Sequence, residues 1–127
     1  MTFLKSHSPS KHFKSFKYAF SGILHALYHE ANFRIQILIT LISIFLGIYF
    51  QISAAEWSVL ILSFSMLLSS EVINTSIENL IDFVVPKKSP IVKIVKDLSA
   101  GFVLINALAF LTILIVIFYG RIINLFV

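Results

Sequence analysis

The residue types best suited to chemistry lie close together in one stretch of the chain. Two carboxylic acids seven residues apart are accompanied by an amide, a hydroxyl and a third acid: Glu71, Glu78, Asn74, Thr75 and Asp82. On an α-helix, steps of three, four, seven and eleven residues return to nearly the same direction. The spacing therefore predicts one polar stripe. It also suits Mg²⁺, which takes few carboxylates and keeps phosphate oxygens among its ligands.

The composition predicts that this stripe lies within a membrane. Of the 127 residues 58% are apolar, whereas only ten are Lys or Arg and six are Asp or Glu. Soluble domains average about 45–50% apolar and about 25% charged residues. A carboxylate in hydrocarbon costs at least about 2.5–3.5 kcal/mol, so it faces protein or water and marks a functional site. The chain contains no Cys, which excludes a disulfide scaffold and a cysteine metal site.

Long stretches with little or no charge predict three transmembrane helices, at about 34–51, 56–81 and 98–120. A span needs about 20 apolar residues, and the second reaches that length only by running on to about Ile81 and carrying the stripe with it. Residues 10–32 interleave Lys with Phe and Leu at helical spacing, which predicts an amphipathic helix on the membrane surface; the alternative is a soluble helix packed on a partner. The predicted fold class is an all-α membrane protein, with residues 1–127 forming a single domain.

Lysine and arginine cluster in two segments and predict the orientation. They are Lys5, Lys11, Lys14, Lys17 and Arg34 before the first span, and Lys87, Lys88, Lys93 and Lys96 between the second and third spans. Because positively charged loops stay cytoplasmic, we expect the N-terminus and the second loop inside and the C-terminus outside. The second group is either a membrane anchor or a phosphate site beside the stripe. No soluble basic face remains for nucleic acid, which excludes that partner.

Three classes of function are compatible with the stripe. A small ion or proton transporter would predict polar groups along the whole membrane depth, whereas here they crowd the predicted cytoplasmic half. A non-enzymatic bundle subunit would predict that Glu71 and Glu78 tolerate replacement by Gln with no loss beyond stability. An enzyme would use the acids in catalysis. Three spans leave little room for a closed pocket in one subunit, which predicts an oligomer with shared sites.

Several blocks of sequence resemble the prokaryotic diacylglycerol kinase family, which also includes undecaprenol kinases. Residues 71–78, EVINTSIE, followed by Asp82, look like the family's signature. Residues 96–101, KDLSAG, look like its second conserved block, and residues 18–22 and 30–34 are similar to its N-terminal region. The likeness covers about residues 11–120 at the right spacing.

The resemblance implies a fold and an activity. The fold is a homotrimeric helical bundle with composite active sites, each subunit having a surface helix and three spans, in the bacterial cytoplasmic (inner) membrane. The activity is that of an ATP- and Mg²⁺-dependent lipid kinase. It would phosphorylate the hydroxyl of diacylglycerol, giving phosphatidate, or of undecaprenol, giving undecaprenyl phosphate.

The resemblance also implies roles for individual residues. Glu71 would be the general base that takes the proton from the lipid hydroxyl, and Glu30 and Glu78 would hold Mg²⁺. Asn74 would hydrogen-bond within the site, and Ala100 would face the lipid. The residues implied around ATP are Lys11, Tyr18, Glu30, Glu78, Lys87, Lys88, Ser89, Lys96 and Asp97.

The chain departs from the family pattern at three places. Many members carry an acid and a His in the turn that here reads PKKSP, residues 86–90. In this chain a lysine of the turn would contact the phosphate in place of those two side chains. Gln36 stands where some members have an acid, and we assign it no role. Lys11 stands where some members have Arg, and a lysine cannot make the bidentate contact that an arginine makes.

Overall fold

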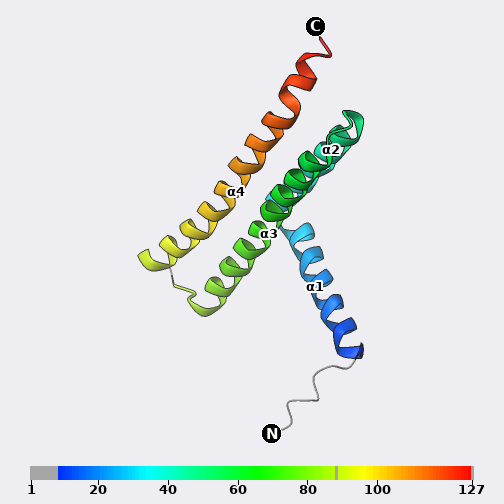
Figure 1. The fold of residues 1–127 in the computed structure, drawn as a ribbon. Helices are drawn as coiled ribbons and strands as arrows, with labels where there is room; N and C mark the ends of the chain where they lie inside the picture. Colours follow the sequence, from blue (N-terminus) through cyan, green and yellow to red (C-terminus); the bar gives the residue numbers. More distant parts are fainter. Residues whose placement is uncertain (1–8, 88, 127) are drawn as a thin grey trace.

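The computed structural model describes residues 9–87 and 89–126, with side chains from residue 13 onward. This part of the chain forms four α-helices and no strand: α1 (Pro9–His29), α2 (Ala31–Tyr49), α3 (Ala54–Val84) and α4 (Pro90–Ile123), as Figure 1 shows. Within it, α2, α3 and α4 are long and apolar enough to cross a membrane. The predicted all-α membrane fold with three spans is confirmed.

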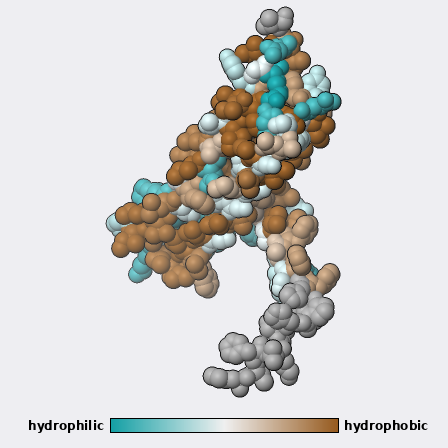
Figure 2. Space-filling model, in the orientation of Figure 1, coloured by the Kyte–Doolittle hydropathy of each residue, from teal (hydrophilic) through white to brown (hydrophobic). Residues whose placement is uncertain are grey.

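Helices α2, α3 and α4 form an antiparallel bundle, and α1 leaves it at an angle (Figure 1). The α3–α4 contact is the most extensive, and α2 packs mainly against α3. Their core is a cluster of large apolar side chains: Ile52, Leu60, Leu67, Phe110, Ile117 and Phe118. Large apolar side chains are also exposed along all three helices, and Figure 2 shows them over much of the visible face. An apolar exterior is the opposite of a soluble surface, and it suits a protein surrounded by lipid or by further copies of itself.

The turn between α2 and α3 explains why α2 ends two residues before the predicted limit of 51. Gln51 adopts a positive φ of 50°. The N–H of Ile52 donates to the carbonyl of Gly47 (3.1 Å), and the N–H of Gln51 donates to that of Ile48 (3.2 Å). These two bonds form a Schellman motif, which satisfies the last carbonyls of a helix and stops it.

Gly47 permits a close approach at this turn. A Cβ atom at this position would lie 2.8 Å from Cη2 of Trp57 and 3.2 Å from Cδ1 of Ile52. The indole of α3 therefore packs directly on the backbone of α2. Two hydroxyl side chains, Thr40 and Ser43, continue the same buried face of α2 along the helix.

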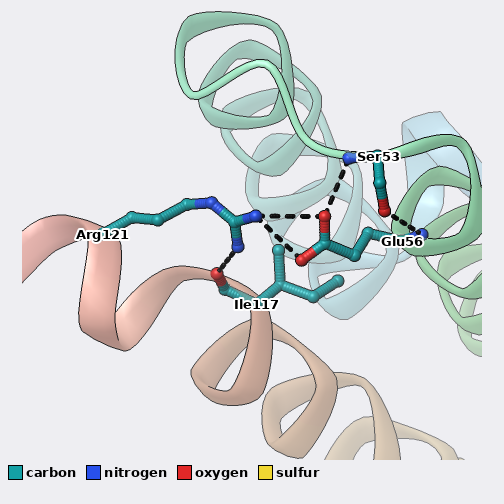
Figure 3. A network of polar contacts seen from close by, with 4 residues as sticks. All are labelled: Ser53, Glu56, Ile117 and Arg121. Carbon is teal, nitrogen blue, oxygen red and sulfur yellow. Dashed lines mark hydrogen bonds and ion pairs between the residues drawn. The ribbon is translucent and has the colours of Figure 1, made fainter.

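A capping network begins α3 and ties it to the end of α4, as Figure 3 shows. The Ser53 hydroxyl accepts from the backbone N–H of Glu56, and the Glu56 carboxylate accepts from the backbone N–H of Ser53. Arg121 forms an ion pair with the same carboxylate, with Nη2 2.9 Å from Oε1, and its Nη1 donates to the carbonyl of Ile117. One carboxylate thereby caps one helix and holds the last turns of another.

The other two connections define the opposite end of the bundle. Ser89 caps α4, its hydroxyl accepting from the N–H of Val92, and Pro90 follows at the first helical position. Both α3 and α4 run past their predicted spans, to Val84 and from Pro90. At the α1–α2 corner, Arg34 Nη1 donates to the carbonyls of Tyr28 (3.0 Å) and Leu27 (3.3 Å), so one guanidinium caps the end of α1.

We predict that Gly47→Ala lowers stability by about 1–3 kcal/mol, because the added methyl group overpacks against Trp57 and the indole must shift. Thermal or denaturant unfolding in detergent micelles measures this. Gly120→Ala is the matched control, since a Cβ atom there meets nothing within 4 Å. Helix propensity alone makes it neutral or stabilising by up to about 1 kcal/mol. Equal effects of the two variants would contradict the close packing at Gly47.

Candidate functional site

Glu71 is the buried centre of the polar stripe. It lies on α3 with only 2% of its surface exposed, between the buried residues Ser70 and Thr75. Its Oε2 accepts a hydrogen bond of 3.0 Å from Nε2 of Gln36 on α2, 35 residues earlier in the chain. A carboxylate held away from water by this packing and bonded to a neutral amide is suited to exchange a proton with a bound hydroxyl.

The next turns of α3 continue the stripe toward the α3–α4 loop. Asn74 and Glu78 are partly buried, and Nδ2 of Asn74 donates to Oε1 of Glu78 at 3.2 Å. Seven residues separate Glu71 from Glu78, which is about 10 Å along the helix axis. The two acids therefore sit at different depths, one inside the bundle and one nearer its end.

Glu30 joins this acidic end from another element. It is the residue between α1 and α2, and its side chain makes no capping bond. Helices α2 and α3 are antiparallel, and Gln36 lies level with Glu71. Glu30 is six residues before Gln36 and Glu78 is seven residues after Glu71, so both lie a similar distance toward the same end of the bundle. The arrangement therefore places Glu30 and Glu78 at about the same level.

The donor set at this level fits Mg²⁺. Among the described residues no group of three or more His, Cys, Asp or Glu is placed to enclose a metal. Mg²⁺ does not need such a cage, because one or two carboxylates suffice when substrate phosphates supply other oxygens. The buried Oδ1 of Asn74 has no hydrogen-bond partner and is a further oxygen beside Glu78.

A polar groove of about 660 Å³ lies where α3 ends and α4 begins. Its charged and hydroxyl-bearing residues are Asp82, Lys87, Ser89, Lys93, Lys96 and Asp97. Nζ of Lys96 lies 2.6 Å from Oδ1 of Asp82, and Lys93 pairs with Asp97 one turn along α4. The structure thus gathers four of the residues implied around ATP, at the end of the bundle that carries Glu78.

Three of the other implied ATP contacts are not placed at this groove. Tyr18 is exposed on α1, and within the described part of the chain no hydrogen bond or ring contact joins it to the groove. Lys88 lies outside the described residues, as does the side chain of Lys11. Their roles stay predictions.

An apolar groove of about 450 Å³ lies between α2 and α4. Ala100, the residue implied to face the lipid, lines it together with large apolar side chains such as Ile39, Leu67 and Phe110. Gln36 lines it too, so the groove wall includes the side chain that is bonded to Glu71. An apolar molecule bound in this groove would therefore lie close to the buried acid.

Several buried polar atoms near this point have no partner in the described structure. They are Oε1 of Gln36 and the hydroxyls of Thr40, Thr75 and Ser99, with Oδ1 of Asn74. Buried polar groups are almost always hydrogen-bonded. Unpartnered atoms contributed by three helices are what a site for a polar ligand or ordered water requires.

Gln36 is the residue that the sequence analysis missed, since we assigned it no role. A signal for it exists in the sequence. Gln36, Thr40, Ser43 and Gly47 are small or polar residues spaced by four, three and four in an apolar helix, and all four are buried. That spacing marks a helix face packed on another helix.

Comparison with known proteins identifies the family. Residues 17–118 match the family described as prokaryotic diacylglycerol kinase. The chain belongs to that family. The predicted enzyme class, a lipid kinase, is confirmed by this membership.

The chain is similar to family members named for two activities. An undecaprenol kinase of Bacillus subtilis is 30% identical over 112 residues, which cover 88% of this chain and 91% of that protein. A diacylglycerol kinase of Helicobacter pylori is 33% identical over 94 residues, 74% of this chain and 73% of that protein. A diacylglycerol kinase of Synechocystis is 32% identical over 96 residues, 75% of this chain but 55% of that protein.

Proposed function

We propose that this lipid kinase transfers the γ-phosphoryl group of ATP to the hydroxyl of a membrane lipid, with Glu71 as the general base. The observation that carries the proposal is the burial of Glu71 beside an apolar groove, with partly buried Glu78 nearer the end of the bundle. A lipid hydroxyl lies at the membrane interface, so the lipid can react without leaving the bilayer. Phosphoryl transfer mostly requires positioning and charge neutralisation, and this arrangement separates those tasks along one helix.

The proposed reaction uses the residues at three levels. At the deepest level, the Glu71 carboxylate accepts the proton of the lipid hydroxyl as its oxygen bonds to the γ-phosphorus. The bond from that phosphorus to the β–γ bridging oxygen breaks, and ADP leaves. At the middle level Glu30 and Glu78, with Asn74, would hold Mg²⁺, which when bound neutralises phosphate charge. At the end of the bundle, Lys96 and the lysines of the polar groove would hold the phosphates as point charges.

Membrane placement follows from the charges. We propose that the α3–α4 loop and the N-terminus are cytoplasmic, because the lysines gather there and ATP is supplied from that side. Helix α1 would lie on the membrane surface. Its large exposed side chains Phe13, Phe16 and Phe20 suit the acyl boundary, while Lys14 and Lys17 suit phosphate headgroups.

We propose a homotrimer with shared sites. Both grooves are open in one chain, and many large apolar side chains of α2 and α4 are exposed, among them Phe45, Leu104 and Ile105. The polar groove lies at Asp82, eleven residues or about 16 Å along the α3 axis from Glu71. Helices of a neighbouring copy would close these surfaces and bring a second set of charges to each site.

Transfer of phosphate to lipid tests the proposed reaction. Purified protein in micelles, with ATP, Mg²⁺ and either diacylglycerol or undecaprenol, should place phosphate on at least one of the two lipids, and the ratio of kcat/KM gives the preferred substrate. Glu71→Gln should lower kcat at least about 100-fold, since general-base catalysis contributes about 10²–10⁴-fold. Glu56→Gln is the matched control, because that acid belongs to the structural network of Arg121. Transfer to neither lipid by a folded protein would refute the proposal.

Nucleotide affinity tests the polar groove. Lys96→Gln should raise KM for ATP about tenfold or more, because a lost charge-assisted hydrogen bond to phosphate is worth about 1.5–3 kcal/mol. Lys93→Gln removes the same charge from the same groove, but its side chain is 76% exposed against 32% for Lys96, and it should raise KM about threefold or less. An equal rise in both variants would show a diffuse electrostatic effect instead of a positioned contact.

Complementation tests the shared sites. At ATP concentrations below the raised KM, Glu71→Gln and Lys96→Gln subunits are each poorly active alone. They should recover activity when unfolded and refolded together, since a mixed trimer can pair an intact acid with an intact lysine. Light scattering or native mass spectrometry should give the mass of three chains. A mixture as inactive as its two parents, with mixed oligomers present, would place each whole site within one chain.

A further inference from the structure

The contact between Gln36 and Glu71 has no counterpart elsewhere among the described hydrogen bonds. It joins two side chains that are both more than nine-tenths buried, and it joins different helices. The other side-chain bonds within the membrane-spanning helices are mostly made inside one helix, as those of Ser43, Ser63 and Ser70 are. A buried amide committed to one carboxylate therefore needs its own explanation.

We infer that Gln36 is a positioning residue for Glu71, and that it stabilises the negative charge of the carboxylate and aims one of its oxygens. The inference rests on the proposed role of Glu71 as the base. Nε2 of Gln36 donates a hydrogen bond to Oε2 of Glu71, which leaves Oε1 of the carboxylate to take the proton. The reverse orientation of the amide would set two oxygens against each other, so the contact also fixes which end of the amide faces the acid.

Among the described residues, no hydrogen bond or ion pair joins a charged side chain to Glu71. On α3 the nearest acid, Glu78, is two turns away. On α2 the guanidinium of Arg34 is bound to carbonyls of α1, and Glu30 is further toward the end of the bundle. On α4 the buried polar side chains are Ser99 and Asn106, both neutral, while the ammonium of Lys96 is paired with Asp82. A neutral donor is thus the only described side-chain support for the charge on Glu71.

The oxygen of the same amide has no hydrogen-bond partner among the described residues. Oε1 of Gln36 is buried and has no partner, and Gln36 lines the apolar groove. Pinned by its Nε2, the amide therefore keeps an acceptor without a protein partner in the wall of the groove. An acid at this position would share its proton with Glu71, whereas an amide donates without titrating.

Two readouts test the inference, one of which needs no substrate. Gln36→Met keeps the length of the side chain but removes the donor. It should lower kcat about 10- to 100-fold with KM for ATP unchanged within about twofold, as expected for a lost hydrogen bond to a charged group. The second readout is the labelling of Glu71 by dicyclohexylcarbodiimide, which reacts with protonated carboxyl groups, followed by peptide mass spectrometry. Labelling should become several-fold faster without the donor.

The chain supplies a matched control, because its other glutamine, Gln51, lies exposed in the α2–α3 turn. Gln51→Met makes the same chemical change and should alter neither readout. Gln36→His restores a ring N–H donor and should recover most of the lost rate; it also serves if the methionine variant does not fold. Unchanged labelling of Glu71 in folded Gln36→Met would refute the inference, and so would several-fold faster labelling in folded Gln36→His, which keeps a donor. Because labelling needs no ATP or lipid, it stays informative even if phosphate transfer fails.

Discussion

The burial of one carboxylate in an apolar bundle is the constraint that the rest of the structure accommodates. Glu71 has almost no contact with solvent, so its charge must be supported by protein groups. That support comes from α2, which approaches α3 through a face of small and polar residues: Gln36, Thr40, Ser43 and Gly47. The close contact of Gly47 with Trp57 at one end of this face and the Gln36–Glu71 bond toward the other hold the same pair of helices in one register.

The ion pairs among the described residues divide into two groups at opposite ends of the bundle. At the α2–α3 turn, Glu56 and Arg121 complete a cap and join two helices, so their role is structural. At the α3–α4 loop, the ion pairs Asp82–Lys96 and Lys93–Asp97 line an open groove. Open ion pairs contribute little to stability, and their charges remain available for an anionic ligand. One end of the molecule therefore serves the fold, and the other carries the groove in which we propose that ATP binds.

The architecture also explains how so short a chain can support phosphoryl transfer. The residues of the proposed site lie at successive depths along α3, from Asp82 through Glu78 to Glu71, so one helix orders them without a large enclosing domain. In a single chain these parts remain open to the outside, as do both grooves. Closure therefore falls to the lipid and, in our proposal, to neighbouring copies of the chain.

The amino-acid sequence by itself determined the helices, their spans and the acidic stripe, because hydrophobic length and helical periodicity are local properties. Residues 71–78 and 96–101 also carried enough of the family pattern to indicate a lipid kinase. Only the tertiary structure decided that α2 ends at Tyr49, that Asp82 pairs with Lys96, and that Gln36 supports Glu71. Each of these depends on side chains or backbone groups meeting across a turn or between helices. Gln36 and Glu71 are 35 residues apart, and they meet because two packed helices have a particular register. No pattern within either helix specifies that register.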